Sequence, residues 1–346
     1  MSGAAPADST TATDALCGWG RTSPTAAAVS SPPDADALER LLKGAEPGVI
    51  ARGLGRSYGD AAQSSGGIVV STSALSSIGP VDRATATVEV GAGTSLHTLM
   101  TALIPQGWFV AVTPGTRYVS IGGAIAADIH GKNHHVSGSF ARHVESLTLV
   151  TPVGTFEVGP DNDPELFWAT AGGMGLTGVV TRARLRLLPV ETSWIDVETT
   201  RFQRLDEVMA EMERNDASSP YSVAWVDCLS HRGSARPCVL TRGDHVRADA
   251  LPPQLRDRRL AVPRPPRLGV PLAPPARLAN RASVRLLNEA WFRASRPGRA
   301  MRTLSSFFHP LDGIGSWNLL YGRQGFVQYQ FLVPSGRGDV VPRAID

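Results

Sequence analysis

Residues 122–135 carry the densest set of chemically active side chains in the chain. They read Gly-Gly-Ala-Ile-Ala-Ala-Asp-Ile-His-Gly-Lys-Asn-His-His, so small residues at a predicted helix start lead into a carboxylate and five other polar side chains. Small side chains let a ligand reach the backbone, and the amides at a helix N-terminus attract anions. The segment therefore predicts contact with a cofactor that carries phosphate.

A second glycine-rich segment, residues 52–60, reads Arg-Gly-Leu-Gly-Arg-Ser-Tyr-Gly-Asp and follows the apolar residues 49–51. Gly53 and Gly55 allow a sharp turn with exposed amides, as in a phosphate-binding nest. Arg52 and Arg56 are placed to add charge-assisted contacts to a diphosphate. A glycine-rich loop after a strand is in most proteins a plain turn. Residues 52–60 therefore indicate a cofactor site only in combination with residues 122–135. Together the two segments predict a flavoenzyme.

A metal site is the other interpretation of residues 128–135. His130 and His134 are four residues apart, but Gly131 weakens a helix between them and no carboxylate completes a familiar ligand spacing. We therefore expect flavin contact and no metal. Lys132 is also notable, because Lys43 is the only other lysine in a chain whose positive charge is otherwise arginine.

The elements that must position these segments alternate irregularly between helix and strand. Hydrophobic spacing and turn residues predict helices at 34–43 and 96–103, and strands at 48–51, 67–71, 86–90, 108–112, 144–151, 154–158 and 179–188. Irregular alternation favours an α+β domain over a doubly wound sheet. We expect residues 1–28, rich in Ala, Ser, Thr and Pro, to be a mobile tail, and residues 29–190 to form the cofactor-binding domain.

The sequence changes in character near Pro189, and residues 191–346 are predicted to form a second, substrate-binding domain of the same α+β class. It contains predicted helices at 205–214 and 284–294 and a strand at 221–227. Residues 251–281 are rich in Pro and Arg, which predicts a mobile loop. Residues 325–334 alternate as a strand, with Gln328 and Gln330 on one face.

Composition argues against several functional classes. The formal net charge is only +3 and no basic run is interleaved with aromatics, so we expect no nucleic-acid partner. Cys17, Cys228 and Cys238 are odd in number and widely spaced, which predicts free thiols. Neither a signal peptide nor an apolar run long enough to cross a bilayer is visible. We expect a soluble protein, or one attached peripherally to a membrane.

Several motifs of the chain are specific to a known family; they occupy residues 18–22, 50–60, 114–117, 128–135, 165–170, 308–312 and 328–331. With these motifs the chain resembles the FAD-dependent oxidoreductases of the vanillyl-alcohol-oxidase type, and most closely their decaprenylphosphoryl-β-D-ribose 2-oxidase branch. The resemblance runs from residue 18 to residue 334, apart from the Pro-rich loop. It implies a two-lobed PCMH-type domain with noncovalently bound FAD, followed by a substrate domain.

Carried onto this sequence, the resemblance assigns three groups of residues. His130, Tyr58 and Lys132 would be catalytic, and Trp225, Gln328 and Gln330 would face the substrate. Taken singly, the two aromatics are typical of packing and the glutamines of a solvated strand; the resemblance favours the functional interpretation. The implied cofactor-binding residues are Arg52, Gly53, Leu54, Gly55, Arg56, Ser57, Tyr58, Gly59, Asp60, Ala61, Gly115, Ser120, Gly122, Gly123, Ala127, Asp128, Ile129, His130, Asn133 and Val180.

The implied reaction moves a hydride from C2 of the ribose in a polyprenyl-phosphate-linked sugar to FAD. A partner NAD-dependent reductase would then convert the 2-keto sugar to the arabinose donor for cell-wall arabinan. The resemblance implies a place at the periplasm or cell envelope, with the cytoplasm as the alternative because no export signal is seen. Two rival functions remain open: a sugar-lactone or alditol oxidase of the same fold, and a non-catalytic flavin-binding remnant.

The sequence departs from this family at its C-terminal end. Relatives continue past residue 334 into a segment that carries part of the flavin domain and a lysine held to assist proton removal. Residues 335–346 look unlike that segment, so we expect a C-terminally truncated chain of doubtful activity. Neither Lys43 nor Lys132 stands where that lysine belongs, and Phe292 stands where relatives tend to carry tyrosine.

Overall fold

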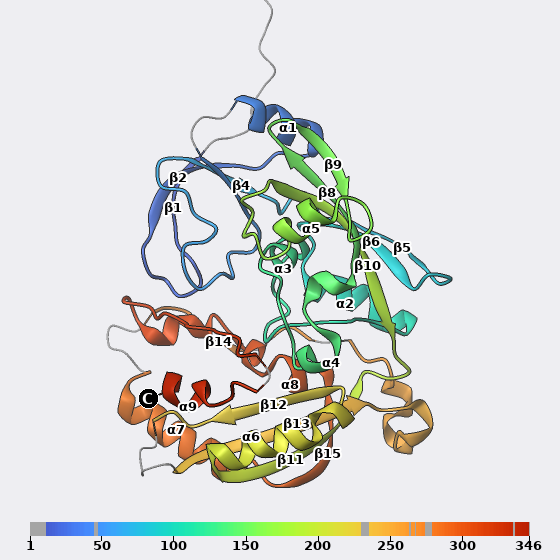
Figure 1. The fold of residues 1–346 in the computed structure, drawn as a ribbon, viewed down its shortest axis with the longest axis vertical. Helices are drawn as coiled ribbons and strands as arrows, with labels where there is room; N and C mark the ends of the chain where they lie inside the picture. Colours follow the sequence, from blue (N-terminus) through green and yellow to red (C-terminus); the bar gives the residue numbers. More distant parts are fainter. Residues whose placement is uncertain are drawn as a thin grey trace, which may run out of the picture. The chain divides into compact units, whose positions relative to one another are not determined.

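The structure, a computed structural model, describes residues 12–44, 48–229, 235–262, 264–266, 268–273, 279–334 and 336–345. The chain divides into two compact units, each considered by itself below. The first contains Met1–His130 and Ser139–Pro189, and the second contains Gly131–Gly138 and Val190–Asp346. Both mix helices and sheets, which confirms the α+β class (Figure 1).

The first unit begins with a four-stranded sheet in the order β1-β2-β4-β3. Its strands are β1 (Ala12–Leu16), β2 (Thr25–Ser30), β3 (Val49–Arg52) and β4 (Ile68–Ser71). β1 and β2 are antiparallel, whereas β4 runs parallel to both β2 and β3. Parallel pairing brings the ends of β3 and β4 to the same edge, so the loop after β3 starts beside Thr72, whose amide donates to the Arg52 carbonyl.

A second, antiparallel sheet of the first unit has the order β5-β6-β10-β8-β9, with β7 pairing to the end of β10. Its strands are β5 (Ile78–Asp82), β6 (Thr87–Gly91), β7 (Trp108–Val110), β8 (Val144–Thr151), β9 (Gly154–Val158) and β10 (Val179–Pro189). The helices of this unit are α1 (Ala35–Gly44), α2 (Leu96–Leu103), α3 (Ile121–Ala126) and α5 (Pro164–Thr170). The helices and strands predicted for residues 34–188 are confirmed, with ends within two residues of those observed.

Helix α1 joins the two sheets of the first unit into one core. Leu38 and Leu42, on its buried face, pack with Val70 of β4, Val150 of β8 and Val179 of β10. All five side chains are almost completely buried. This core holds the ends of β3, β4 and β10 in fixed positions, and the loops that follow or precede those strands inherit that rigidity.

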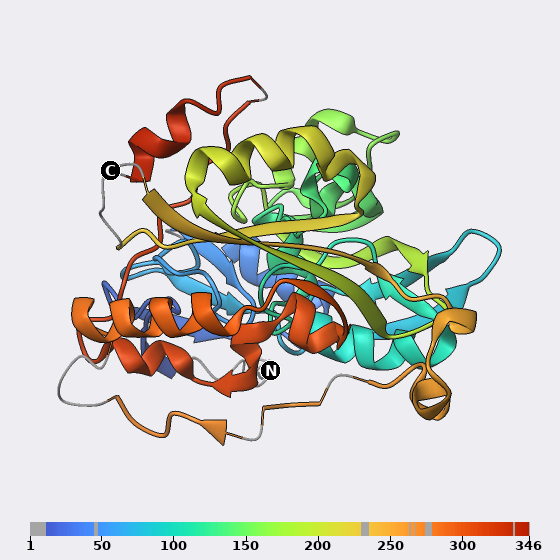
Figure 2. The same ribbon diagram turned by 90° about the horizontal axis from the view of Figure 1, so that it is seen from below.

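The second unit is built on an antiparallel sheet in the order β12-β13-β11-β15. Its elements are α4 (His134–Ser137), β11 (Trp194–Arg204), α6 (Leu205–Asn215), β12 (Tyr221–Val226), β13 (Ala235–His245), α7 (Arg281–Ala294), β15 (Gly298–Thr303), α8 (Leu304–Phe308) and α9 (Val340–Ile345). Figure 2 shows α6 on one face of this sheet and α7 and α8 on the other. Leu205 and Val208 of α6 pack on Cys238 and Leu240 of β13. The predicted elements at 205–214, 221–227 and 284–294 are present, whereas β11, β13 and β15 were not predicted.

The structure differs from the expected mobile tail. Residues 12–28 form β1 and most of β2, and Ala27 is only 2% exposed; residues 1–11 lie outside the described part of the chain. The composition of small residues suggested a mobile tail. A strand, however, needs only a neighbouring strand edge with which to form backbone hydrogen bonds, and β4 provides that edge to β2. Residues 131–138, expected in the cofactor domain, group with the second unit.

The strand predicted at residues 325–334 is wrong. Within the described residues this segment belongs to no sheet. Both alternating faces are exposed: Gln328 and Gln330 on one, and Val327 (83%) and Tyr329 (85%) on the other. Alternation defines two faces but does not supply a neighbouring strand. The Pro-rich segment contains a 3₁₀ turn, Pro253–Arg258, and a two-residue parallel bridge of β14 (Leu268–Gly269) to β16 (Ile314–Gly315); residues 263, 267 and 274–278 lie outside the described residues.

Candidate functional site

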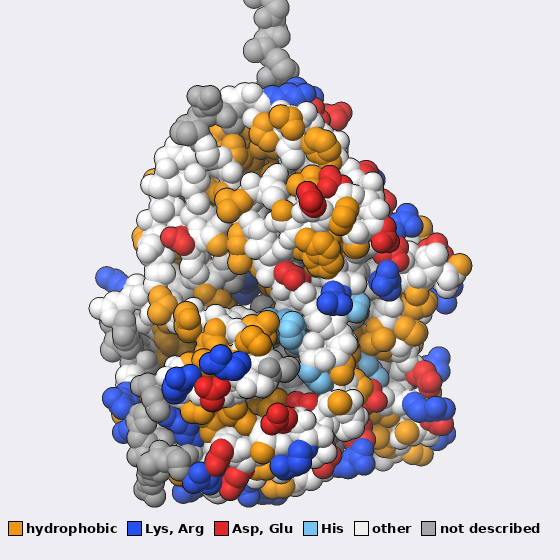
Figure 3. Space-filling model, viewed as in Figure 1, with side chains coloured by type: hydrophobic (Ala, Val, Ile, Leu, Met, Phe, Trp, Pro, Cys, Tyr) orange, Lys and Arg blue, Asp and Glu red, His pale blue; other side chains and the backbone are white. Residues whose placement is uncertain are grey.

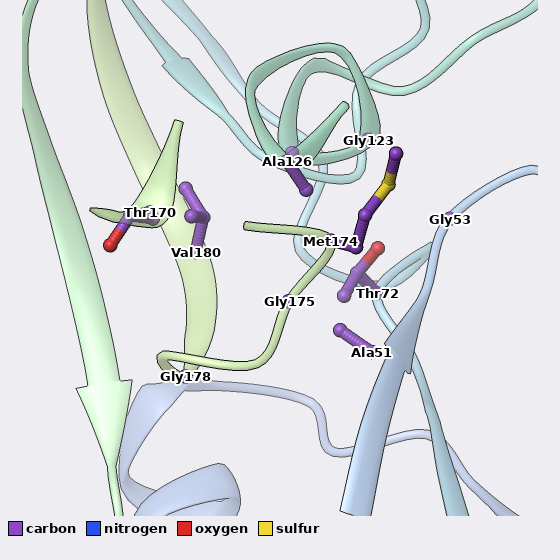
Figure 4. A pocket seen from close by; sticks show the side chains of 11 residues that line it. Ala51, Gly53, Thr72, Gly123, Ala126, Thr170, Met174, Gly175, Gly178 and Val180 are labelled. Carbon is purple, nitrogen blue, oxygen red and sulfur yellow. The ribbon is translucent and has the colours of Figure 1, made fainter. Parts of the chain in front are cut away.

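A pocket in the first unit is lined almost entirely by glycine, alanine and threonine from four parts of the chain (Figure 4). It holds about 430 Å³ of space free of atoms, part of it open to solvent. None of its lining residues is acidic, so it presents no charge that would repel an anion. They are Ala51, Gly53, Thr72, Gly122, Gly123, Ala126, Thr170, Met174, Gly175, Gly178 and Val180.

The two glycine segments identified in the sequence meet at this pocket. Gly53 lies so close to Ser120 that a Cβ at position 53 would be 2.0 Å from the Ser120 Oγ. Ser120 in turn caps α3, because its Oγ accepts a hydrogen bond from the Gly123 amide at 3.3 Å. A Cβ on Gly122 would lie 3.0 Å from the Ala92 Cβ. A larger residue at position 53 would have to displace the Ser120 side chain, and one at position 122 would press against Ala92.

Residues 53–61, called here the cofactor loop, present amides to an incoming ligand. The amides of Gly53, Leu54, Gly55, Ser57 and Gly59 have no acceptor within the described residues. Gly55 has a φ of +63°, in the left-handed region that lets successive amides point toward one concave side. A run of backbone donors of this kind suits the diphosphate of a dinucleotide.

The N-terminus of α3 does not offer amides in the way we expected. The Ile121 amide donates to the Thr94 carbonyl at 2.9 Å and the Gly122 amide to the Ala92 carbonyl at 2.8 Å, while Gly123 bonds to Ser120. Because the first three amides of the helix already have acceptors, the helix contributes close backbone approach rather than donors. That part of the prediction was wrong.

The Arg52 side chain holds the cofactor loop to the segments before and after it through two hydrogen bonds. Its Nη2 donates to the Cys17 carbonyl at 2.8 Å and its Nη1 to the Ala62 carbonyl at 3.2 Å. A Cβ on Gly55 would lie 2.6 Å from the same guanidinium. Burial lowers the pKa of Arg52 from its usual value. We expected Arg52 to contact the diphosphate; the structure uses at least two of its donors to bond the Cys17 carbonyl and the Ala62 carbonyl, which directly follows the loop.

Asp128 ends α3 in a strained conformation. Its φ is +37°, and its Oδ1 accepts the amide of Ala141 at 2.9 Å, so the carboxylate holds the turn at Phe140–His143. The chain bends back here, because the Phe140 amide donates to the Ile129 carbonyl. Of the predicted site residues around this bend, Gly123, Ala127 and His130 are exposed, which leaves them accessible to a ligand.

Lys132 and Asn133 belong to the second unit. The Ser222 amide of β12 donates to the Lys132 carbonyl at 2.8 Å, and the Lys132 Nζ lies 4.6 Å from the centre of the Phe307 ring. Burial, with a smaller contribution from the positive charge of Arg302, lowers the pKa of Lys132 to about 8. A substantial fraction of this amine is therefore neutral at a slightly alkaline pH. Asn133 is 4% exposed.

The structure places the predicted substrate residues in different settings. Trp225 is half-buried on β12, opposite Val239 of β13. Gln328 and Gln330 lie in the exposed, irregular segment after residue 325, so the strand face they were expected to share is not present. In the first unit, Tyr58 is half-buried in the cofactor loop and Gly115 is exposed.

A third glycine-rich segment, residues 172–178, lines the pocket and was not predicted as part of the site. Gly175 and Gly178 have φ values of +83° and +149°, and a Cβ on Gly178 would lie 2.7 Å from the Val150 carbonyl. Figure 4 shows the Met174 side chain between Gly53 and Gly123. Four glycines in seven residues were the available signal, the same one that drew attention to residues 52–60.

The residues of the first unit fit FAD. The pocket is a cradle of backbone and small side chains. Beside it, the cofactor loop has five amides without an acceptor among the described residues, and these match the acceptors of a diphosphate. Among the residues that the structure describes, no cluster of three or more His, Cys, Asp or Glu is arranged to hold a metal ion. The described helices include none with the length and apolar character needed to span a membrane.

Comparisons with known proteins agree with this site. A family model described as an FAD binding domain matches residues 26–159. The decaprenylphosphoryl-β-D-ribose oxidase of Mycolicibacterium smegmatis is 44% identical over 94% of this chain and 72% of its own length. An uncharacterized Streptomyces coelicolor protein, from the mprA 5' region, is 39% identical over 71% of this chain and 69% of its own. Cytokinin dehydrogenase 4 of Arabidopsis thaliana is 32% identical, over 42% of this chain and 29% of its own. This chain therefore belongs to the family of FAD-dependent oxidoreductases that includes the Mycolicibacterium decaprenylphosphoryl-β-D-ribose oxidase.

Proposed function

We propose that this chain oxidises the C2 hydroxyl of the ribose in decaprenylphosphoryl-β-D-ribose to a 2-keto sugar. This would be the first half of an epimerisation that supplies arabinose for cell-wall arabinogalactan and lipoarabinomannan. The observation that carries the proposal is the 44% identity, over 94% of the chain, to a protein named for oxidising that lipid-linked ribose. The glycine-lined pocket and the amides of the cofactor loop support the redox part of it.

When bound, noncovalent FAD supplies a ring that accepts the hydride from the sugar carbon. The amides of the cofactor loop would hold the diphosphate, and the close contact of Gly53 with Ser120 keeps this loop in place. Oxidation of an alcohol also requires a group that takes the hydroxyl proton. Lys132 suits this role, because a lysine with a pKa of about 8 provides a neutral amine at much lower pH than an ordinary lysine. Exposed His130 and half-buried Tyr58 are the other candidates.

Anaerobic stopped-flow spectroscopy of the flavin-loaded protein tests the proposal. Mixing with a polyprenylphosphoryl ribose is expected to bleach the oxidised flavin absorbance, whereas a soluble alditol or sugar lactone leaves it unchanged. Lys132→Met is expected to slow bleaching at least about a hundredfold while the flavin stays bound. Bleaching by the alditol alone would establish the sugar oxidase instead, and no bleaching by either would establish a flavin-binding protein without turnover.

We further propose that the chain works at an anionic membrane surface, where a lipid-linked sugar resides, and passes its product to an NAD-dependent keto-sugar reductase. Residues 251–302 contain twelve arginines and two acidic residues, a formal charge of +10 in a chain of +3. Leu268, Leu286 and Trp291 of this stretch are exposed by 76%, 74% and 48%. Arginines beside exposed apolar side chains are typical of surfaces that bind anionic lipid.

Sedimentation with lipid vesicles tests this surface. Binding is expected to vesicles that contain phosphatidylglycerol and to weaken as salt is added. Replacing the exposed Arg256, Arg258 and Arg259 by Gln is expected to reduce it severalfold. Equal binding to purely zwitterionic vesicles, or unchanged binding of the triple variant, would contradict an electrostatic attachment by this segment.

A further inference from the structure

Residues 17–21, called here the N-terminal strap, lie directly against the cofactor loop. The amide of Trp19 donates to the carbonyl of Ser57 at 2.7 Å, and the amide of Gly20 donates to the carbonyl of Tyr58 at 3.0 Å. The strap was singled out in the sequence as a motif, but neither the pocket nor the proposed reaction accounts for it. The hydrogen bonds of the strap indicate that it acts on the cofactor loop.

Gly18 fixes how closely the strap approaches. A Cβ at this buried position would lie 2.0 Å from the carbonyl oxygen of Gly59 and 2.7 Å from that of Ser57. No side chain fits in that gap. The bond from the Arg52 guanidinium to the Cys17 carbonyl fastens the start of the strap to the start of the loop.

The strap determines which way the peptide groups of the loop face. In a planar trans peptide the C=O and the N–H that share the C–N bond point in opposite directions. Because the carbonyls of Ser57 and Tyr58 point at the strap, the amides of Tyr58 and Gly59 point away from it. The strap thus fixes the direction of two consecutive N–H groups, and the second, that of Gly59, has no acceptor among the described residues.

Trp19 adds a second contact, to a charged side chain of the loop. The guanidinium carbon of Arg56 lies 3.8 Å from the centre of the Trp19 ring and 5.5 Å from that of Tyr118. At 3.8 Å the guanidinium is within the range of a cation–π interaction, which holds a flexible, positively charged side chain in one position. An arginine held this way loses less conformational entropy when it binds a phosphate.

We propose that the N-terminal strap is a positioning element for the cofactor: it holds the cofactor loop in its anion-binding conformation and, through Trp19, holds Arg56 ready for the FAD diphosphate. The strap itself need not touch the cofactor. The proposal concerns FAD binding and does not depend on which sugar is the substrate.

Titration of the apoprotein with FAD, followed by quenching of flavin fluorescence, tests the proposal. Trp19→Ala is expected to raise the Kd for FAD about tenfold, from the loss of the cation–π contact. Trp19→Phe keeps an aromatic face, so its Kd for FAD is expected to stay within about threefold of that of the wild type. Gly18→Ala must separate strap from loop, so a larger increase, of about a hundredfold, is expected.

A double-mutant cycle shows whether Trp19 acts through Arg56. In an Arg56→Gln background, Trp19→Ala is expected to change the Kd by less than about twofold, because the charge it positions is already gone. The same tenfold loss in both backgrounds would overturn this role for Trp19.

The matched control is Trp168→Ala. Trp168 lies on α5 and is 47% exposed, and Figure 3 shows apolar side chains exposed over the region of α5 and β9. This variant is expected to bind FAD as the wild type does. Thermal unfolding of each apoprotein separates positioning from stability. If Trp19→Ala lowers the Tm of the apoprotein but leaves the Kd for FAD unchanged, the strap is structural only and the proposal fails.

Discussion

At the scale of single residues, the contact between Gly53 and Ser120 brings two distant segments of the sequence together. Neither residue carries chemistry of its own. Gly53 lets the cofactor loop pass against Ser120, and Ser120 holds the first turn of α3 through the Gly123 amide. The shape of the cofactor-binding site thus depends on the missing side chain of Gly53 and on the Ser120 hydroxyl that packs against it.

Gly53→Ala is expected to raise the Kd for FAD at least about tenfold, because a Cβ would lie 2.0 Å from the Ser120 Oγ and force the loop outward. Combining it with Ser120→Ala removes that oxygen and leaves the Ser120 Cβ at 3.0 Å, so part of the affinity should return. Fluorescence titration of both variants measures the effect. An additive loss in the double variant would show that the two positions do not interact.

Lys132 gives the unfolding free energy a characteristic pH dependence. Its pKa is about 8 in the folded chain and near 10.5 when unfolded, so between these values the unfolded state binds more protons. Stability from this group therefore rises as pH increases from 8 to 10.5. Relative to Lys132→Met, the wild type is expected to gain about 2 kcal/mol across this window, after allowance for partial exposure. Urea unfolding of both proteins at pH 7.5 and pH 10 measures the difference, and parallel pH profiles would contradict it.

At the scale of elements, the site is assembled from the ends of secondary structure. The cofactor loop follows β3, Thr72 follows β4, and Val180 lies near the start of β10. The short helix α3 is capped at its start by the Ser120 side chain, and just after its last turn Asp128 bonds the amide of Ala141 in the following turn. A six-residue helix has little stability of its own, so the Ser120 cap, the turn fixed by Asp128 and the buried Ile121 and Ile125 must maintain it.

Asp128→Ala is expected to lower the free energy of unfolding by about 2 kcal/mol, because it removes the acceptor of the Ala141 amide and leaves a φ of +37° that alanine tolerates poorly. Asparagine at position 128 keeps an acceptor and tolerates a positive φ. The free energy of unfolding of Asp128→Asn should therefore stay within about 0.5 kcal/mol of that of the wild type. Urea denaturation compares the three proteins. Equal destabilisation by both substitutions would point to a need for the negative charge itself.

At the scale of the whole molecule, the chain consists of two units with separate cores. The pocket and the cofactor loop belong entirely to the first unit, whereas Lys132 and Trp225 belong to the second. The division follows the sequence closely at Pro189, but residues 131–138 join the second unit through the bond from the Ser222 amide to the Lys132 carbonyl.

FAD binding is expected to stabilise the first unit preferentially. At about one hundred times its Kd, FAD adds about 2.7 kcal/mol to the unit that binds it. Differential scanning calorimetry of the apoprotein, with and without FAD, should show an upward shift of one unfolding component and little change in the other. Shifts of equal size in both components would contradict a pocket formed by the first unit alone.

Local pattern was sufficient for much of the first unit. Apolar spacing located most of its helices and strands from residue 34 onward but missed β5, and glycine content located two of the segments that line the pocket. Apolar spacing failed for β11, β13 and β15, where charged and polar residues interrupt the alternation; in β11, Arg201 stands on the same face as the buried Ile195 and Val197. It also failed for residues 325–334, which alternate well and form no strand.

By itself, the sequence determined the α+β class, the glycine segments and the family, because these depend on residue types and their order. Only the tertiary structure decided which amides have acceptors, that Arg52 bonds the carbonyls of Cys17 and Ala62, that residues 172–178 complete the pocket, and that the expected tail forms two strands and a strap. Hydrogen bonds and close approaches join residues far apart in the chain, and no local pattern of the sequence specifies which distant acceptor a given donor will bond.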